Sequence, residues 1–172
     1  HVSFDLSLKG DDMSFNKLAL AVLLIYSLNA PAFGSEANIQ ASKIPTVIRP
    51  AIEKIKDSKT PLMLPTWLPS TCAGPLDTGK GPFQDGYELW LGTCSADTTF
   101  FTSAGKGKAT KTKHAIKLMN GKTAYIQNLK DFCLEWSDNG NVYRVGYPSK
   151  GAKSDSAILM KIANSMKFVD SK

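Results

Sequence analysis

The 172-residue sequence contains few of the residues that build catalytic or metal-binding centres. It has three cysteines and two histidines, and none of the cysteines belongs to a C-x-x-C pair. A structural zinc site takes about four cysteine or histidine ligands at short spacings, so we expect no zinc site. A G-x-S-x-G nucleophile elbow is also absent. These absences argue against the common zinc-dependent and serine-hydrolase classes.

The sequence also lacks an apolar run long enough to cross a membrane. The run that follows Lys17 covers about 11 residues even if it is extended to Leu28, against roughly 20 for a spanning helix. Small residues follow this run, with Ala32 and Gly34 at the −3 and −1 positions of a cleavage site. This order is typical of a secretory signal peptide. We therefore predict a signal peptide over residues 13–34 rather than a membrane anchor.

Cleavage after this segment would leave a small basic chain. Residues 1–12 contain three aspartates where a signal peptide needs positive charge, so we interpret them as an upstream extension or an expression remnant. The remaining chain divides into an N-terminal segment at 35–60, with a short helix, and a single domain at 61–172. Without residues 1–34 the chain has 19 basic and 12 acidic residues, a net charge of +7. Such a charge favours association with anionic surfaces or acidic partners.

Export places the three cysteines in an oxidising compartment, where one disulfide is the default expectation. We favour a bond between Cys94 and Cys133, because alternation along a strand at 87–94 places Cys94 on the outer face of the predicted sheet, where Cys133 also lies. A bond between Cys72 and Cys94 is the alternative, which would close a loop rich in glycine and proline.

The N-terminal part predicts a short helix followed by an extended segment. Pro50 can be the first residue of a helix that places Ile52 and Ile55 on one face. Three prolines between residues 61 and 69 then forbid a long helix and favour an extended edge strand. The side chains of this segment that we expect to pack on the core are Leu62, Leu64, Trp67 and Leu68.

Further patterns predict an antiparallel sheet and a C-terminal helix. Alternation predicts strands at 87–94 and 98–103, and an Asn-Gly turn at 120–121 predicts a hairpin. Ser154 or Asp155 can cap the last helix. Its apolar stripe consists of Ile158, Leu159, Ile162, Ala163 and Met166. We predict an α+β fold, in which an antiparallel sheet of about five to seven strands carries a short N-terminal helix and a C-terminal helix packed on one face.

The stretch FCLEWSDNGNVYRVGY, residues 132–147, predicts a hairpin with a two-residue turn at Asn139 and Gly140. Counting outward from this turn pairs Glu135 with Arg144 on the polar side, as a cross-strand ion pair. On the apolar side each pair contributes roughly 0.2–1 kcal/mol. The residues of this hairpin core are Leu134, Trp136, Tyr143 and Val145, with Phe132 and Tyr147 beyond them.

Four stretches together resemble a known family. They are PTWLPS, LMNGKTAYI, LEWSDNGNVYRVGY and ILMKIANSMKF. Their order is similar to that of small bacterial exported domains of unknown function, whose relatives also form the extracytoplasmic C-terminal domain of some anti-sigma-factor proteins. The resemblance implies no catalytic site. This sequence shows neither a sigma-binding domain nor a membrane span, so we expect no direct signalling role.

Cys133 is the residue of the predicted hairpin that could act as a nucleophile. A catalytic thiol needs a base, usually histidine. His114, at the edge of a lysine-rich loop, is the only candidate left after signal-peptide cleavage. We interpret Cys133, which faces Gly146 on the polar side of the hairpin, as a structural cysteine. We predict no catalytic residue, no metal and no cofactor.

The lysine-rich stretch KGKATKTKH is the strongest candidate for a binding surface. Lysines at alternate positions place several charges on one side of an extended ribbon, which could contact phosphate or another polyanion. The alternative is a solvated, flexible loop that protects a hairpin edge from aggregation. The stretch has no interleaved aromatic residue for base stacking, so we expect no nucleic-acid binding. The candidate contact residues are Lys106, Lys108, Lys111, Lys113 and His114.

These observations favour an exported, periplasmic or extracellular, non-catalytic domain that binds a partner or associates with the cell envelope. The expected partner is an envelope protein or an anionic envelope component, and no membrane span is expected after processing. Two alternatives remain open. One is a small envelope enzyme with an unrecognised site, and the other is an inhibitor or immunity-type protein that acts on an envelope hydrolase.

Overall fold

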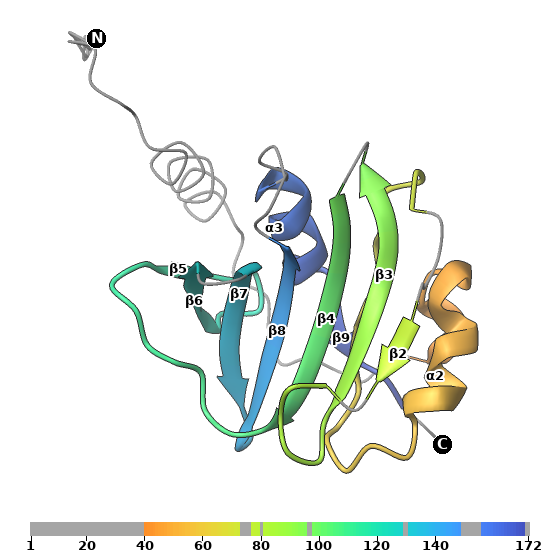
Figure 1. Cartoon of the computed structure of the whole chain (residues 1–172), viewed down its shortest axis with the longest axis horizontal. Coiled ribbons are helices and arrows are strands. Elements are labelled where there is room, and N and C mark those ends of the chain that lie inside the picture. Colours follow the sequence, from red (N-terminus) through yellow and green to blue (C-terminus); the bar gives the residue numbers. More distant parts are fainter. Residues whose placement is uncertain are drawn as a thin grey trace, which may run out of the picture.

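A seven-stranded antiparallel sheet is the main element of the structure. The computed structural model describes residues 40–72, 77–79, 81–95, 98–128, 131–148 and 156–170, and the expected signal peptide lies outside this part. Within these ranges the strand order is β2-β3-β4-β8-β7-β6-β5 (Figure 1). The strands are β2 (Asp77–Gly79), β3 (Tyr87–Ser95), β4 (Thr98–Lys106), β5 (Ala115–Lys117), β6 (Thr123–Asn128), β7 (Asp131–Asp138) and β8 (Asn141–Pro148).

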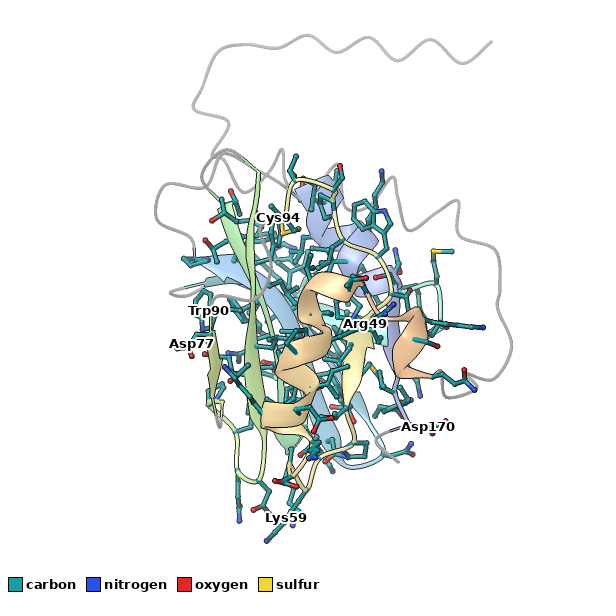
Figure 2. All side chains as sticks on the ribbon, turned by 90° about the vertical axis from the view of Figure 1, so that its right-hand side faces the viewer. Arg49, Lys59, Asp77, Trp90, Cys94 and Asp170 are labelled. Carbon is teal, nitrogen blue, oxygen red and sulfur yellow. A yellow bond between two sulfur atoms is a disulfide. The ribbon has the colours of Figure 1, made fainter. Side chains whose placement is uncertain are left out.

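The helices and a small second sheet form the other layer. The second sheet pairs β1 (Met63–Pro65) with β9 (Met166–Phe168). The helical elements are η1 (Ala41–Lys43), η2 (Thr46–Ile48), α2 (Arg49–Ile55) and α3 (Ser156–Asn164). Figure 2 shows this layer on one side of the large sheet, with α2 in front of it. The prediction of an α+β fold with a helix near each end is confirmed.

The core lies between these two layers. Tyr87, Leu89 and Leu91 alternate along β3 and are at most 1% exposed. They belong to one apolar cluster that also contains Ile52 and Ile55 of α2. From α3 and the segment after it, the cluster receives Leu159, Met160, Ile162, Ala163 and Met166, with Ile158 partly buried beside it. The proposed caps Ser154 and Asp155 lie outside the described residues.

The predicted hairpin is confirmed in every pair. The turn residues Asn139 and Gly140 have φ values of 47° and 77°, which a two-residue turn of this hand requires. The register pairs Glu135 with Arg144 and continues outward through the pairs expected from the sequence. The hairpin core residues Leu134, Trp136, Tyr143 and Val145 are all at most 1% exposed.

The extended segment after α2 differs from the prediction at one residue. Leu62 and Leu64 are buried and Leu68 packs partly buried against the core. Trp67, however, is 36% exposed, so its predicted place in the core is wrong. The strand ends at Pro65, and the chain then turns outward to bond the end of α3. Thus Trp67 lies beneath the ammonium of Lys161, 5.4 Å from the ring centroid.

The disulfide joins Cys72 to Cys94, so the favoured Cys94–Cys133 bond is wrong. In the sheet, β4 and β8 separate the strands that carry Cys94 and Cys133. Two register irregularities in β3 also break the alternation, and Cys94 turns into the core cluster with Cys72. Cys133 is buried and is not part of the disulfide.

Candidate functional site

The connection from β4 to β5 forms the candidate site. We call residues 107–114 the basic strap. The strap leaves the lower end of β4, runs past the ends of β8 and β7 and reaches β5 at the far edge of the sheet (Figure 1). Its bonds to Ser137 and Glu135 place its middle on the outer face of the sheet, away from the core. It thereby bridges β8, β7 and β6, the strands that separate β4 from β5 in the sheet.

Hydrogen bonds from the outer face hold the middle of the strap. The amide of Ala109 donates to the hydroxyl of Ser137 at 2.6 Å, and the amide of Thr110 donates to Glu135 Oε1 at 2.6 Å. The side-chain amide of Gln127 donates in turn to the carbonyl of Thr110 at 2.6 Å. Backbone donors and acceptors of the strap therefore meet specific side chains of β7 and β6.

Both ends of the strap are also fixed. The amide of Gly107 donates to the carbonyl of Gly140 at 3.2 Å, and the amide of Ile126 donates to the carbonyl of His114 at 2.9 Å. The hydroxyl of Thr112 lies 3.1 Å from the carbonyl of Ile126. Hydrogen bonds at its ends and middle therefore anchor the backbone of the strap to the sheet.

Glu135 is the centre of this anchoring. Its side chain is 3% exposed, and its Oε2 accepts two bonds from the guanidinium of Arg144, at 2.6 and 3.1 Å. The predicted cross-strand ion pair is thus confirmed. The guanidinium also lies over the ring of Phe83, 4.9 Å from its centroid. One buried carboxylate therefore binds both a neighbouring strand and, through the amide of Thr110, the strap.

The predicted contact residues fall into two groups. Lys108, Lys111 and Lys113 are exposed on the strap, and none of them forms an ion pair within the part of the chain that the structure describes. Lys106 instead pairs with Asp85, with 3.1 Å between ammonium and carboxylate. His114 is half-buried, and its backbone joins the strap to β6. Three lysines therefore form the available basic surface.

Asp85 is a contact point that the sequence did not reveal. Its backbone has φ 56°, and its carbonyl accepts hydrogen bonds from the hydroxyls of Ser58 and Thr60. Its carboxylate lies near Lys106 and Lys59, and the hydrogen bond from Lys106 holds the pKa of Asp85 below its ordinary value. Asp85 precedes Gly86, and aspartate tolerates the left-handed conformation that a turn at this position needs.

Cys133 has no open approach for a substrate. The residue is 2% exposed and stands opposite Gly146 on the outer face. A Cβ atom added at position 146 would lie 2.4 Å from Cys133 Cβ and 3.0 Å from the ring of Phe101. This packing accounts for a glycine at that position. Its fit to the sheet supports the interpretation of Cys133 as a structural residue.

The described residues contain neither a cluster of metal ligands nor a membrane-spanning helix. In this part of the chain, no three histidine, cysteine, aspartate or glutamate side chains gather closely enough to hold a metal ion. Nor does any described helix combine the length and apolar character needed to span a membrane.

Comparisons of the chain with models of protein families, with curated proteins and with solved structures found no significant match.

Proposed function

We propose that this protein is an exported, non-catalytic binding domain that attaches to a phosphate-bearing anionic component of the cell envelope through its basic strap. The observation that carries the proposal is the anchoring of the strap. Lys108, Lys111 and Lys113 are exposed, while the backbone between them is bonded to Glu135 and Gln127 of the sheet. The disulfide and the signal-peptide pattern at 13–34 support export.

An anchored basic ribbon suits a phosphate-bearing surface. Each lysine close to an anionic membrane surface contributes about 1 kcal/mol to binding. The three strap lysines together would then contribute about 3 kcal/mol, or roughly 100-fold in affinity. Because the strap backbone is already ordered, binding does not have to order it, and this loss of entropy is avoided.

The test compares two triple variants of equal charge in the full chain. In the strap variant, Lys108, Lys111 and Lys113 become glutamine. In the control variant, exposed lysines away from the strap become glutamine, namely Lys43, Lys56 and Lys161. Binding is measured to phosphatidylethanolamine vesicles with and without phosphatidylglycerol, and to soluble inorganic polyphosphate. The vesicles and the polymer distinguish a lipid headgroup from a free polyphosphate as the source of phosphate.

The wild-type protein should bind at least one phosphate-bearing probe, with an affinity that falls as salt rises, since exposed charges are screened. The strap variant should lose roughly 100-fold in affinity and the control variant much less. Wild-type protein that binds neither probe would overturn the proposal. Equal losses in the two variants would also overturn it, because they would assign binding to net charge and not to the strap.

A further inference from the structure

A cleft beside α2 forms a second candidate site. It has a volume of about 610 Å³ and lies between the end of α2, β2 and the loop that leads into β3. Small-molecule sites commonly have volumes of roughly 300–1,000 Å³. None of the strap lysines lines the cleft. In Figure 2, α2 stands in front of the sheet, with Lys59 at the lower end and Asp77 marking β2 at one side.

The inner wall of the cleft is apolar. Three apolar or aromatic residues line it, namely Ile55, Phe83 and Tyr87, of which Ile55 and Tyr87 are at most 4% exposed. The hydroxyl of Tyr87 is fully used, because it donates to the carbonyl of Met63 and accepts from the amide of Met63, both at 2.9 Å. The Tyr87 hydroxyl is therefore not available to a ligand, and an apolar body suits the wall that Ile55 and Phe83 line.

The rim of the cleft carries both signs of charge. Lys54 and Asp57 line it, and within the described residues neither forms an ion pair. The hydroxyl of Thr78, also in the lining, bonds to no other described residue. Lys59 and Asp85 also line the cleft, but they already have partners. The ammonium of Lys59 lies 3.8 Å from the carboxylate of Asp85, which also pairs with Lys106. One cation, one anion and one hydroxyl of the rim are thus available to a ligand.

From this arrangement we infer that the cleft binds a small zwitterion with an apolar body, such as an apolar amino acid or short peptide. Lys54 and the hydroxyl of Thr78 bind its carboxylate, Asp57 binds its ammonium group, and its side chain packs on Ile55 and Phe83. A ligand that carries only a carboxylate or only an ammonium group would leave one rim charge, Asp57 or Lys54, without a partner. Covering that charge would remove its bound water without replacing it, which weakens binding.

The first experiment compares three molecules that share one apolar body. L-phenylalanine, 3-phenylpropanoate and 2-phenylethylamine are titrated separately into the full chain by calorimetry. L-phenylalanine should bind, and each singly charged analogue should bind at least about 10-fold more weakly, because one charged hydrogen bond is lost. No binding of L-phenylalanine, or equal binding of either analogue, would overturn the inference.

The second experiment changes the rim. Lys54→Met and Asp57→Asn should each weaken binding of L-phenylalanine about 10-fold or more. Glu53→Gln and Lys56→Met are matched controls, because these exposed residues lie on the same turns but do not line the cleft. Their affinities should stay within a factor of about two of wild type, and thermal unfolding checks that each variant is folded. Equal losses in the controls would contradict the assignment of Lys54 and Asp57.

Discussion

Glu135 links the stability of the sheet to the position of the strap. Its carboxylate is buried and binds both Arg144 and the amide of Thr110. Removing one partner of a buried ion pair leaves a charge without compensation. Arg144 is 24% exposed and keeps some contact with water. Removing the charge of Glu135 should therefore lower the free energy of unfolding by less than it would in a fully buried pair.

Glu135→Gln should therefore lower the free energy of unfolding by about 1–3 kcal/mol and speed hydrogen exchange at the Thr110 amide. Urea unfolding and exchange measured by NMR give the two quantities. Glu53→Gln is the control, because Glu53 forms an exposed pair with Lys56 and should change stability by less than about 1 kcal/mol. An unchanged exchange rate at Thr110 in the Glu135 variant would show that the carboxylate does not hold the strap.

Asp85 predicts a pH dependence of stability. The hydrogen bond from Lys106 lowers the pKa of Asp85 in the folded protein below its ordinary value of 3.8. A lowered pKa in the folded state stabilises the protein above the unfolded-state pKa, and this contribution disappears as pH falls through the folded-state pKa. Its side chain is 23% exposed, so the effect should be modest.

In Asp85→Asn, the loss of stability relative to wild type should be present at neutral pH and shrink on acidification below the ordinary carboxyl pKa. Urea midpoints measured across the acid range test this. A difference between the two proteins that grows toward low pH would have the wrong sign and would refute the assignment.

Among the elements, the disulfide fixes how the segment after β1 meets the sheet. Cys72 and Cys94 are 22 residues apart, and closing a loop of this length stabilises a protein by about 3 kcal/mol in the chain-entropy model. The hydroxyl of Thr71, beside Cys72, also donates to the carbonyl of Cys94 at 2.5 Å. Covalent and hydrogen bonds thus hold the same two segments together.

Replacing both Cys72 and Cys94 with serine should lower the free energy of unfolding by about 3 kcal/mol. Wild-type protein under reducing conditions should lose a similar amount, and peptide mapping of the oxidised protein should recover the Cys72 and Cys94 peptides joined. A joined peptide that contains Cys133 would contradict this pairing. So would a reduced protein as stable as the oxidised one.

Elements whose signals are local could be predicted from the sequence. The β7–β8 hairpin follows from the turn at 139–140 and the alternation on either side of it, and its register is correct throughout. The helix at 49–55 follows from Pro50 and the spacing of its isoleucines. In these cases a single stretch of sequence contains both the turn or helix signal and the apolar face.

Elements that depend on distant partners could not be predicted. Strands β2 and β9 have three residues each, and each is defined by the strand it pairs with rather than by its own alternation. The irregularities in β3 that turn Cys94 inward leave no signal in composition. The anchors of the strap are equally remote, since Glu135 lies 25 residues after Thr110. The sequence therefore predicts the lysines of the candidate site, but it does not predict the hydrogen bonds that anchor their backbone to the sheet.

At the scale of the whole molecule, the two proposed sites use different residues but share one contact. The cleft lies beside α2, and the strap is held on the outer face of the sheet by Glu135. Phe83 of the cleft lies beneath the guanidinium of Arg144, which pairs with Glu135. The variants proposed for the strap lysines change no residue of the cleft, and the variants of Lys54 and Asp57 change no residue of the strap, so each site has its own test.

The affinity ratio of the two triple-lysine variants tests the central claim most directly. Both variants lose the same formal charge, so net charge alone cannot explain a difference between them. If the anchored strap binds phosphate, the strap variant should bind phosphatidylglycerol vesicles or polyphosphate roughly 100-fold more weakly than wild type, and the control variant should remain close to it. A ratio near one between the two variants would contradict the account.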